Sequence, residues 1–269
     1  MARGRTETFL TRSFDGEVGG RMPDELVVEE PLEIRLDDVR VATTMRTPGH
    51  DFELAAGWCH AEGLLGGAPI ETVRYCATGS AVETGFNVVS VATGGAAPAP
   101  TPRLTTSSSS CGLCGSDALA EMIERVHPLP AGAADEFTPR VLATAPAAMR
   151  ADQDLFDRTG AVHAAAAFDP DGAVVLVRED IGRHNAVDKV VGRLLLDGAL
   201  PAHGFGLAVS GRASFEIVQK AWAAGFAAVV AVSAPSALAV ATARRAGMAL
   251  AGFARDGALR LYAGPGVDG

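Results

Sequence analysis

The chain of 269 residues is long enough for one large domain or two smaller ones. Its net charge of -9 argues against nucleic acid as a general partner, because such binding needs a basic face. The N-terminus has basic residues but no apolar run after them, so we expect no secretory signal and a cytoplasmic protein. Four cysteines are too few for a disulfide scaffold in a chain of this length, and we therefore expect reduced thiols.

The first part of the chain, residues 1–97, is expected to form a small α+β domain. Two short apolar runs within 25–45 meet at Asp37 and its neighbouring aspartate, which predicts two strands and a turn. A helical pattern covers 52–67 and ends in two glycines. Residues 70–92 again have the character of strands.

A flexible linker is predicted over residues 98–138, together with a cysteine loop and a helix. Gly, Pro, Ser and Thr dominate 93–110, which has almost nothing to bury. Four serines then directly precede Cys111 and Cys114, a CxxC pair. Apolar residues at helical spacing from 119 to 126 predict that a helix follows the cysteines.

The remaining residues, 139–269, are expected to form an α/β domain. A helix is predicted over roughly 147–158, and then a β-hairpin that turns at 169–172. A strand, a polar loop and a helix follow three times, which implies a largely parallel sheet covered by helices. The apolar stretch 224–243 has nearly the length of a membrane span, but Pro235 interrupts it. We expect a buried strand, a turn and a helix there, and no membrane contact.

Polar side chains follow three of these strands where each strand ends. In an open α/β sheet, ligands bind beyond the carboxyl ends of the strands, where loops lead into helix N-termini. Gly, Ser and Arg at such places favour an anion, most often phosphate, although the same residues also serve as caps and turns. The candidates are Glu179, Asp180, Gly182, Arg183, His184 and Asn185, then Ser210, Gly211, Arg212 and Ser214, then Ser233, Pro235 and Ser236. Neither a dinucleotide-binding glycine fingerprint nor a P-loop is present.

The cysteine pair allows three chemical interpretations besides that of two incidental loop residues. A structural zinc site needs four ligands, and no second pair stands at a suitable spacing. A thioredoxin-like switch would follow a strand, whereas Cys111 follows a serine run. A carrier fits the context better, because the start of a helix close to Cys114 lowers the thiol pKa and raises the thiolate fraction.

Several longer stretches occur together in one order. They are "RTPGHDFELAAGWCHAEGLL", "SSCGLCG", "TGAVHAAA", "EDIGRHNAVDKVVG", "SGRASFEIVQKAWAAG", "SAPSALAVATA" and "GFARDG". From about residue 30 to its end, the chain resembles the formate dehydrogenase accessory protein family, sulfurtransferases that carry sulfur to the molybdenum cofactor. The fourth and fifth stretches are highly specific, whereas a CxxC alone would be weak.

The resemblance implies a function for the cysteines. Cys111 would take sulfur from a cysteine desulfurase as a persulfide, and Cys114 would assist its transfer or release. The acceptor would be the bis-molybdopterin guanine dinucleotide form of the molybdenum cofactor, before it enters the formate dehydrogenase catalytic subunit. The resemblance also implies a homodimer, and a cytidine-deaminase-like mixed sheet flanked by helices in residues 139–269.

Site residues for the cofactor come from two sources. By resemblance, the guanine nucleotide moiety would contact the segment Phe253, Ala254, Arg255, Asp256, Gly257 and Ala258. From the predicted helix N-termini, the residues expected to hold or polarise the anionic cofactor are Arg183, His184, Lys189, Ser210 and Arg212. The acidic residues expected to brace the loops are Glu179, Asp180, Asp188 and Glu216.

Two rival functions can be compared with this one. A zinc deaminase needs His-x-Glu, whereas His184 and His163 are both followed two residues later by alanine. We therefore reject deamination and expect no structural metal. A binding chaperone that holds the cofactor, with a CxxC that only senses redox state, stays the alternative to a sulfur carrier.

Overall fold

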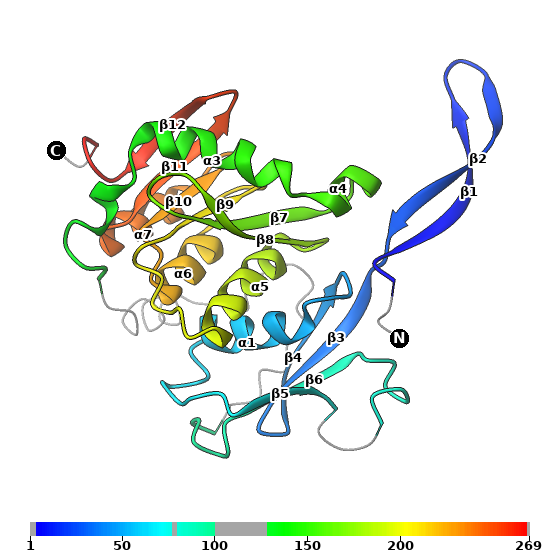
Figure 1. The fold of residues 1–269 in the computed structure, drawn as a ribbon, viewed down its shortest axis with the longest axis horizontal. Helices are drawn as coiled ribbons and strands as arrows, with labels where there is room; N and C mark the ends of the chain where they lie inside the picture. Colours follow the sequence, from blue (N-terminus) through cyan, green and yellow to red (C-terminus); the bar gives the residue numbers. More distant parts are fainter. Residues whose placement is uncertain (1–3, 77–79, 100–127, 268–269) are drawn as a thin grey trace.

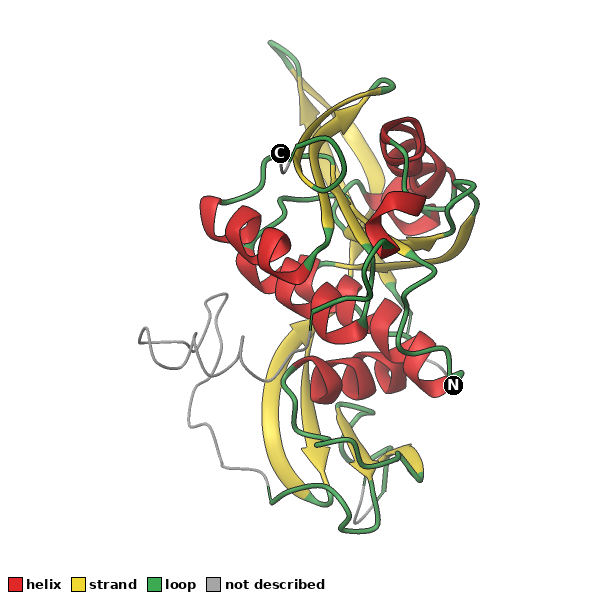
Figure 2. Cartoon of the chain, turned by 90° about the vertical axis from the view of Figure 1, so that its left-hand side faces the viewer, coloured by secondary structure: helices red, strands yellow, loops and turns green. Residues whose placement is uncertain are grey.

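The computed structural model describes residues 4–76, 80–99 and 128–267, which form three sheets. Two larger sheets lie on either side of a layer of helices (Figures 1 and 2). A separate two-stranded hairpin projects from this body (Figure 1). The cysteine pair, Cys111 and Cys114, and the helix predicted after it lie outside the described residues.

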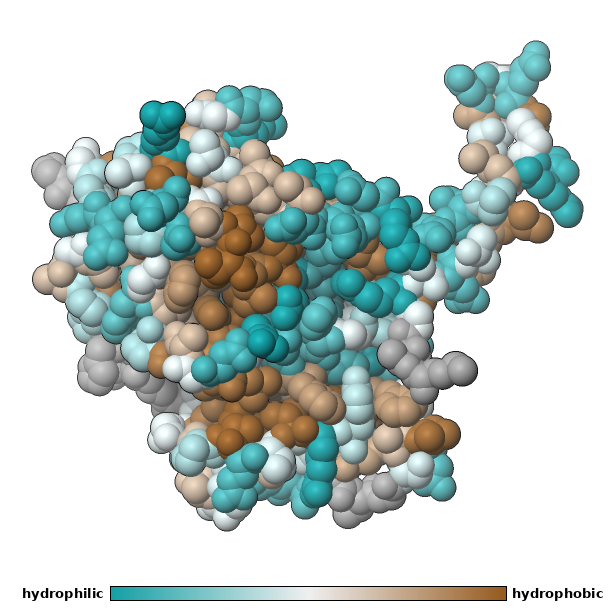
Figure 3. Space-filling view, viewed as in Figure 1, coloured by the Kyte–Doolittle hydropathy of each residue, from teal (hydrophilic) through white to brown (hydrophobic). Residues whose placement is uncertain are grey.

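The projecting hairpin consists of β1 (Thr6–Phe14) and β2 (Val18–Val27), and we call it the arm. The sequence analysis assigned no strand before residue 25, although Asp15-Gly16 is a common hairpin turn. Large apolar side chains are exposed on it: Phe9, Leu10, Phe14, Val18, Met22 and Leu26. Figure 3 shows such side chains among polar ones along the arm. Apolar exposure of this kind is typical of contact surfaces.

The N-terminal sheet has the strand order β4-β3-β6-β5. Its elements are β3 (Glu30–Leu36), β4 (Val39–Arg46), α1 (Asp51–Ala61), β5 (Thr72–Tyr75) and β6 (Val88–Ala92). The predicted turn at Asp37 and Asp38 is confirmed, since both residues have left-handed backbones. The predicted helix is shorter than expected, because its C-cap is already at Glu62 and Gly63 follows with φ 70°.

The C-terminal sheet has the order β12-β11-β10-β9-β7-β8. Its strands are β7 (His163–Phe168), β8 (Val174–Asp180), β9 (Gly206–Val209), β10 (Ala228–Ala231), β11 (Ala249–Arg255) and β12 (Ala258–Ala263). The expected largely parallel sheet is only partly correct. β9, β10 and β11 are parallel, whereas the β7–β8, β7–β9 and β11–β12 pairs are antiparallel.

Helices cover both faces of this sheet. They are the 3₁₀ helix η1 (Ala133–Glu136), α3 (Pro139–Ala151), α4 (Asp154–Thr159), α5 (Arg183–Leu196), α6 (Phe215–Ala224) and α7 (Ala237–Ala246). One core joins α5, α6 and α7 to the sheet, and a second joins α3 to the opposite face. The predicted helix over roughly 147–158 is wrong in its bounds, because Pro139 starts α3 and Pro146 lies within it. Proline suits the first turn of a helix, where its missing N–H is not needed.

Helices α1 and α5 join the two larger sheets by direct backbone contact. A Cβ atom added at Gly57 would overlap the carbonyl oxygen of Asp188 and lie 2.7 Å from the backbone nitrogen of Gly192. A Cβ at Gly192 would in turn overlap the carbonyl oxygen of Glu53. The two helices therefore approach this closely only because both positions are glycine.

The fold class is thus confirmed as α/β, with a C-terminal mixed sheet flanked by helices and a smaller N-terminal α+β part. The strand, turn and helix expected over 224–243 are present as β10 and α7. Among the described residues, no helix is both long and apolar enough to span a bilayer. The domain limits at residues 97 and 138 stay a prediction.

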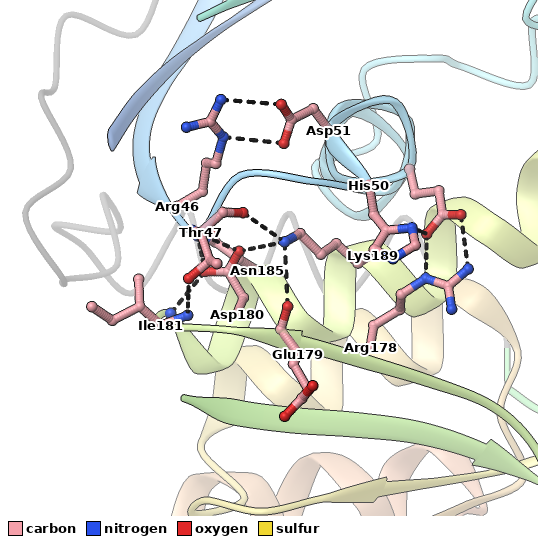
Figure 4. A network of polar contacts seen from close by, with 12 residues as sticks. Arg46, Thr47, His50, Asp51, Arg178, Glu179, Asp180, Ile181, Asn185 and Lys189 are labelled. Carbon is pink, nitrogen blue, oxygen red and sulfur yellow. Dashed lines mark hydrogen bonds and ion pairs between the residues drawn. The ribbon is translucent and has the colours of Figure 1, made fainter. Parts of the chain in front are cut away.

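An ion pair between the buried Glu53 of α1 and Arg178 of β8 links the N-terminal part to the C-terminal sheet. Glu53 accepts hydrogen bonds from Arg178 of β8, Nε to Oε2 at 2.5 Å and Nη2 to Oε1 at 2.9 Å, and His50 lies 3.5 Å away (Figure 4). Burial alone would raise the pKa of Glu53, but Arg178 and His50 outweigh it and lower the pKa to about 2.

The Glu53 carboxylate is expected to contribute to the free energy of unfolding in a way that is lost in acid. Because the folded pKa is below the unfolded value of 4.5, the stabilisation is complete above that pH and is lost as the pH falls towards about 2. We expect Glu53→Gln to remove up to about 3 kcal/mol of unfolding free energy at pH 7 and much less near pH 2. Urea titrations across this range would measure the difference. Glu33→Gln, which breaks an ion pair with Arg35, is the control and should cost about 1 kcal/mol or less throughout.

Candidate ligand site at the strand ends

The loops that follow β9 and β10 and the end of β11 meet at one edge of the C-terminal sheet. Ser233 donates its backbone N–H to the carbonyl of Gly211 at 3.2 Å, and Phe253 donates to the carbonyl of Ser233 at 3.1 Å. The backbone N–H of Ser236 also donates to the carbonyl of Ala213 at 3.0 Å. The strand-end loops chosen from the sequence are therefore neighbours in the structure.

A histidine that the sequence analysis did not select lies at the same edge. His163 is the first residue of β7, and because β7 runs antiparallel to β9, its start lies beside the end of β9. Its Nδ1 is 3.2 Å from the hydroxyl of Ser210, which also accepts the Ala164 N–H at 2.9 Å. Burial, with Arg183 and His184 nearby, lowers the pKa of His163, so its imidazole is neutral at pH 7.

The first turns of α5 and α6 come together where His184 faces Glu216. His184 Nε2 lies 2.9 Å from Glu216 Oε2. The Arg183 side chain extends towards Gly211, where an added Cβ would be 3.7 Å from Arg183 Cδ. Arg183 Nε and Ser214 Oγ are buried atoms without a hydrogen-bond partner among the described residues. Buried polar atoms in this state call for a ligand, an ion or water.

The N-termini of α5 and α6 also lack side-chain caps in the described part of the chain. Gly182 precedes α5, and Ser214 precedes α6 without capping it. At α7, by contrast, the Ser236 hydroxyl accepts the Ala239 N–H at 3.1 Å. Uncapped backbone N–H groups and the helix dipole favour an anion, so this geometry can bind phosphate. Arg212, exposed beside them, can add a charge.

The loop before α5 is held by the carboxylate of Asp180. It accepts hydrogen bonds from Gly182 N at 2.8 Å, Asn185 Nδ2 at 3.0 Å and Thr47 N at 3.2 Å. Lys189 Nζ lies 2.7 Å from the same carboxylate (Figure 4). The N-terminal part of the chain thus helps to position Arg183 and His184.

The expected role of Lys189 at the cofactor is wrong. Its side chain is fully buried, and its ammonium group contacts Asp180 and the carbonyls of Thr47 and Glu179. An ammonium group with three oxygen partners and no solvent access cannot reach a ligand at the sheet edge.

Two of the acidic residues expected to brace the strand-end loops contact other helices instead, whereas Asp180 holds the loop before α5 as expected. Glu179 accepts the N–H groups of Leu155 and Phe156 at the start of α4. Asp188 accepts a 2.7 Å hydrogen bond from Lys220 of α6. Each carboxylate is engaged with a partner within the fold.

The segment from Phe253 to Ala258 forms the end of β11, a turn and the start of β12. Phe253 and Asp256 have left-handed backbones, with φ 51° and 54°. Ala254 is buried in the core, so a ligand could meet it only through its backbone. Arg255, Asp256, Gly257 and Ala258 are exposed.

The described cysteines are unsuited to carrying a group. Cys59 lies in the core, where burial and the charge of Asp188 raise its pKa to about 12, so the thiol stays protonated. Cys76 is also buried, with Sγ 2.8 Å from Thr84 Oγ1. No cluster of three or more His, Cys, Asp or Glu side chains in the described ranges could hold a metal ion.

Comparison with known proteins identifies the family. The model described as "FdhD/NarQ family" matches residues 27–267. The chain belongs to the FdhD/NarQ family. The resemblance found in the sequence is thereby confirmed.

Curated relatives in the FdhD/NarQ family match nearly the whole chain. A protein of Streptomyces avermitilis named sulfur carrier protein FdhD is 46% identical, over 98% of this chain and 95% of its own. One of the same name from Streptomyces coelicolor is 47% identical, with the same coverage. The crystal structure of a formate dehydrogenase accessory protein from Desulfotalea psychrophila has a TM-score of 0.75 and 21% identity, covering 98% of this chain and 99% of that one. At that identity the likeness supports the fold alone.

Proposed function

We propose that this protein is a sulfur carrier in the maturation of formate dehydrogenase. The observation that carries the proposal is the near-full-length identity of 46–47% to relatives named as sulfur carriers. The anion-binding geometry at the starts of α5 and α6 supports a phosphate-bearing acceptor at the sheet edge.

The carrier step is nucleophilic substitution at sulfur. The thiolate of Cys111 attacks the outer sulfur of the desulfurase persulfide, a new S–S bond forms, and the desulfurase cysteine leaves as a thiolate. Attack of Cys114 on the inner sulfur of the resulting Cys111 persulfide would release the outer sulfur as hydrosulfide. Both electrons of the broken bond leave with it, and a Cys111–Cys114 disulfide remains for a thiol reductant to open.

The acceptor in this proposal is the bis-molybdopterin guanine dinucleotide cofactor, bound as a substrate. Its guanine nucleotide would lie at Phe253–Ala258, and its phosphates at Arg183, His184, Ser210 and Arg212. The open helix N-termini and the unpartnered Arg183 Nε support this placement.

The proposed partners are a cysteine desulfurase and the formate dehydrogenase catalytic subunit. We place the reaction in the cytoplasm, where reducing conditions keep both thiols free. The homodimer stays a prediction.

Sulfur loading tests the carrier function. The protein is incubated with a cysteine desulfurase and cysteine, and its intact mass is measured before and after thiol reduction. We expect a gain of sulfur that reductant removes, and its loss in Cys111→Ala. Ser110→Ala, the neighbouring residue, is the matched control and should load normally.

The outcomes separate the two functions. If the parent protein gains no reducible sulfur, the carrier function is wrong and the chaperone with a redox-sensing pair replaces it. If Cys111→Ala loads normally while Cys114→Ala does not, the carrier function stands and the assignment to Cys111 is wrong.

A further inference from the structure

An aromatic–arginine pair lies at the sheet edge beside the candidate site. The guanidinium carbon of Arg260, on β12, is 4.8 Å from the centroid of the Phe253 ring, on β11. The backbone of Phe253 hydrogen-bonds to Ser233, whose own N–H bonds to Gly211. The pair is therefore part of the same row of strand ends as Ser210 and the start of α6. Arg260 was not selected from the sequence.

The backbone of Phe253 is held in a rare conformation. A left-handed φ of 51° is unfavourable for an aromatic residue, and such strain persists where the surroundings impose it. The preceding Gly252 packs so closely that an added Cβ would lie 2.8 Å from Pro235 Cδ and 3.1 Å from the Ser233 carbonyl oxygen. The backbone that carries the ring is thereby restrained, and backbone strain of this kind is concentrated at functional sites.

The ring orients Arg260 without occupying its hydrogen-bond donors. Arg260 is exposed, and no hydrogen bond or ion pair joins its guanidinium group to another residue in the described ranges. A guanidinium group stacked on an aromatic face keeps its N–H edge free and loses less freedom on binding than a mobile one.

The free N–H donors of the Arg260 guanidinium group match guanine better than adenine or cytosine. Guanine presents two adjacent acceptors, O6 and N7, which a guanidinium fork can bind together. Adenine places an amino donor beside N7, and cytosine also presents an amino donor. We propose that Arg260, positioned by Phe253, recognises the guanine base of the bound nucleotide and selects it over adenine and cytosine. The inference rests on the proposed function and names the residue that sets its base specificity.

The spacing of the strands agrees with this placement. Arg260 lies on β12, three strands from β9, or about 14 Å at the usual spacing between neighbours. A base at Arg260 would leave a diphosphate near Gly211 and the uncapped start of α6. There the buried Arg183 Nε and Ser214 Oγ lack partners within the described part of the chain.

Calorimetric titration of the full chain with GDP, ADP and CDP tests the inference. We expect the parent protein to prefer GDP by about tenfold or more, the effect of one bidentate arginine–guanine contact. Arg260→Lys keeps the charge but not the fork, and should lose this preference while its ADP affinity is unchanged. Phe253→Leu should weaken the preference by releasing Arg260. Arg40→Lys, on the N-terminal sheet, is the matched control and should retain it.

Two outcomes would contradict the role proposed for Arg260. Arg260→Lys that keeps the GDP preference within about twofold of the parent would falsify the inference. So would a parent protein without preference for GDP. Sulfur loading of Cys111, measured on the same samples, separates this failure from failure of the carrier function, because Arg260 has no part in loading.

Discussion

Replacing Lys189 by methionine is expected to reduce the free energy of unfolding by about 3–5 kcal/mol. The substitution leaves the carboxylate of Asp180 without its counter-charge in a site where both side chains have no solvent exposure. A buried unpaired charge is among the most costly defects in a fold. Urea titration followed by circular dichroism would measure the loss.

Two further variants, one of an exposed ion pair and one of Asp180, serve as comparisons for Lys189→Met. Asp197→Asn breaks the exposed Arg193–Asp197 pair, and should cost about 1 kcal/mol or less. Asp180→Asn should cost less than Lys189→Met, because burial already lowers the pKa of Lys189 and the amine can become neutral. A loss in Lys189→Met no greater than that of Asp197→Asn would contradict the structural role given to the pair.

Gly57→Ala is expected to destabilise the protein by about 2–3 kcal/mol, although alanine is the better helix former. The gain in helix propensity is about 1 kcal/mol. It is outweighed because the new methyl group meets the backbone of α5 at Asp188 and Gly192, which cannot move aside as a side chain can. Gly57→Val should be worse than Gly57→Ala. Thermal and urea unfolding would measure both.

Gly204→Ala supplies the matched control for this contact. Nothing lies within 4 Å of an added Cβ at Gly204. We expect a change within about 0.5 kcal/mol there. If Gly57→Ala proved as stable as this control, the helices could not be in backbone contact at that point.

Much of the C-terminal half could be predicted because its strands are short apolar runs and its helices are amphipathic. The direction of β7 could not, since no local pattern encodes whether a strand runs parallel to its neighbour. Because the direction of β7 was unknown, His163 was not selected: it lies at the start of a strand, whereas the candidate residues were sought at strand ends. The beginning of α3 was not predicted because prolines usually interrupt helices. Pro139 lies in the first turn of α3, the part of a helix where proline is tolerated.

The sequence could predict which strand-end residues lie close together, but not all of the contacts around them. Ser210 and Arg183 could be selected because strand ends and helix starts bind anions wherever they occur. Lys189 was misplaced because its partner Thr47 is 142 residues away along the chain. Arg260 gave no signal, since its contact with Phe253 depends on the left-handed backbone before a hairpin turn.

The glycine contact between α1 and α5 limits how the molecule can move. Two helices that meet through their backbones have no layer of side chains to slide or repack between them. Closure of the N-terminal sheet over the C-terminal one would have to break this contact and the Glu53–Arg178 pair together. The described body therefore has no hinge at this crossing. Any adjustment at the strand ends falls to the loops there, and the two sheets act as a fixed frame around them.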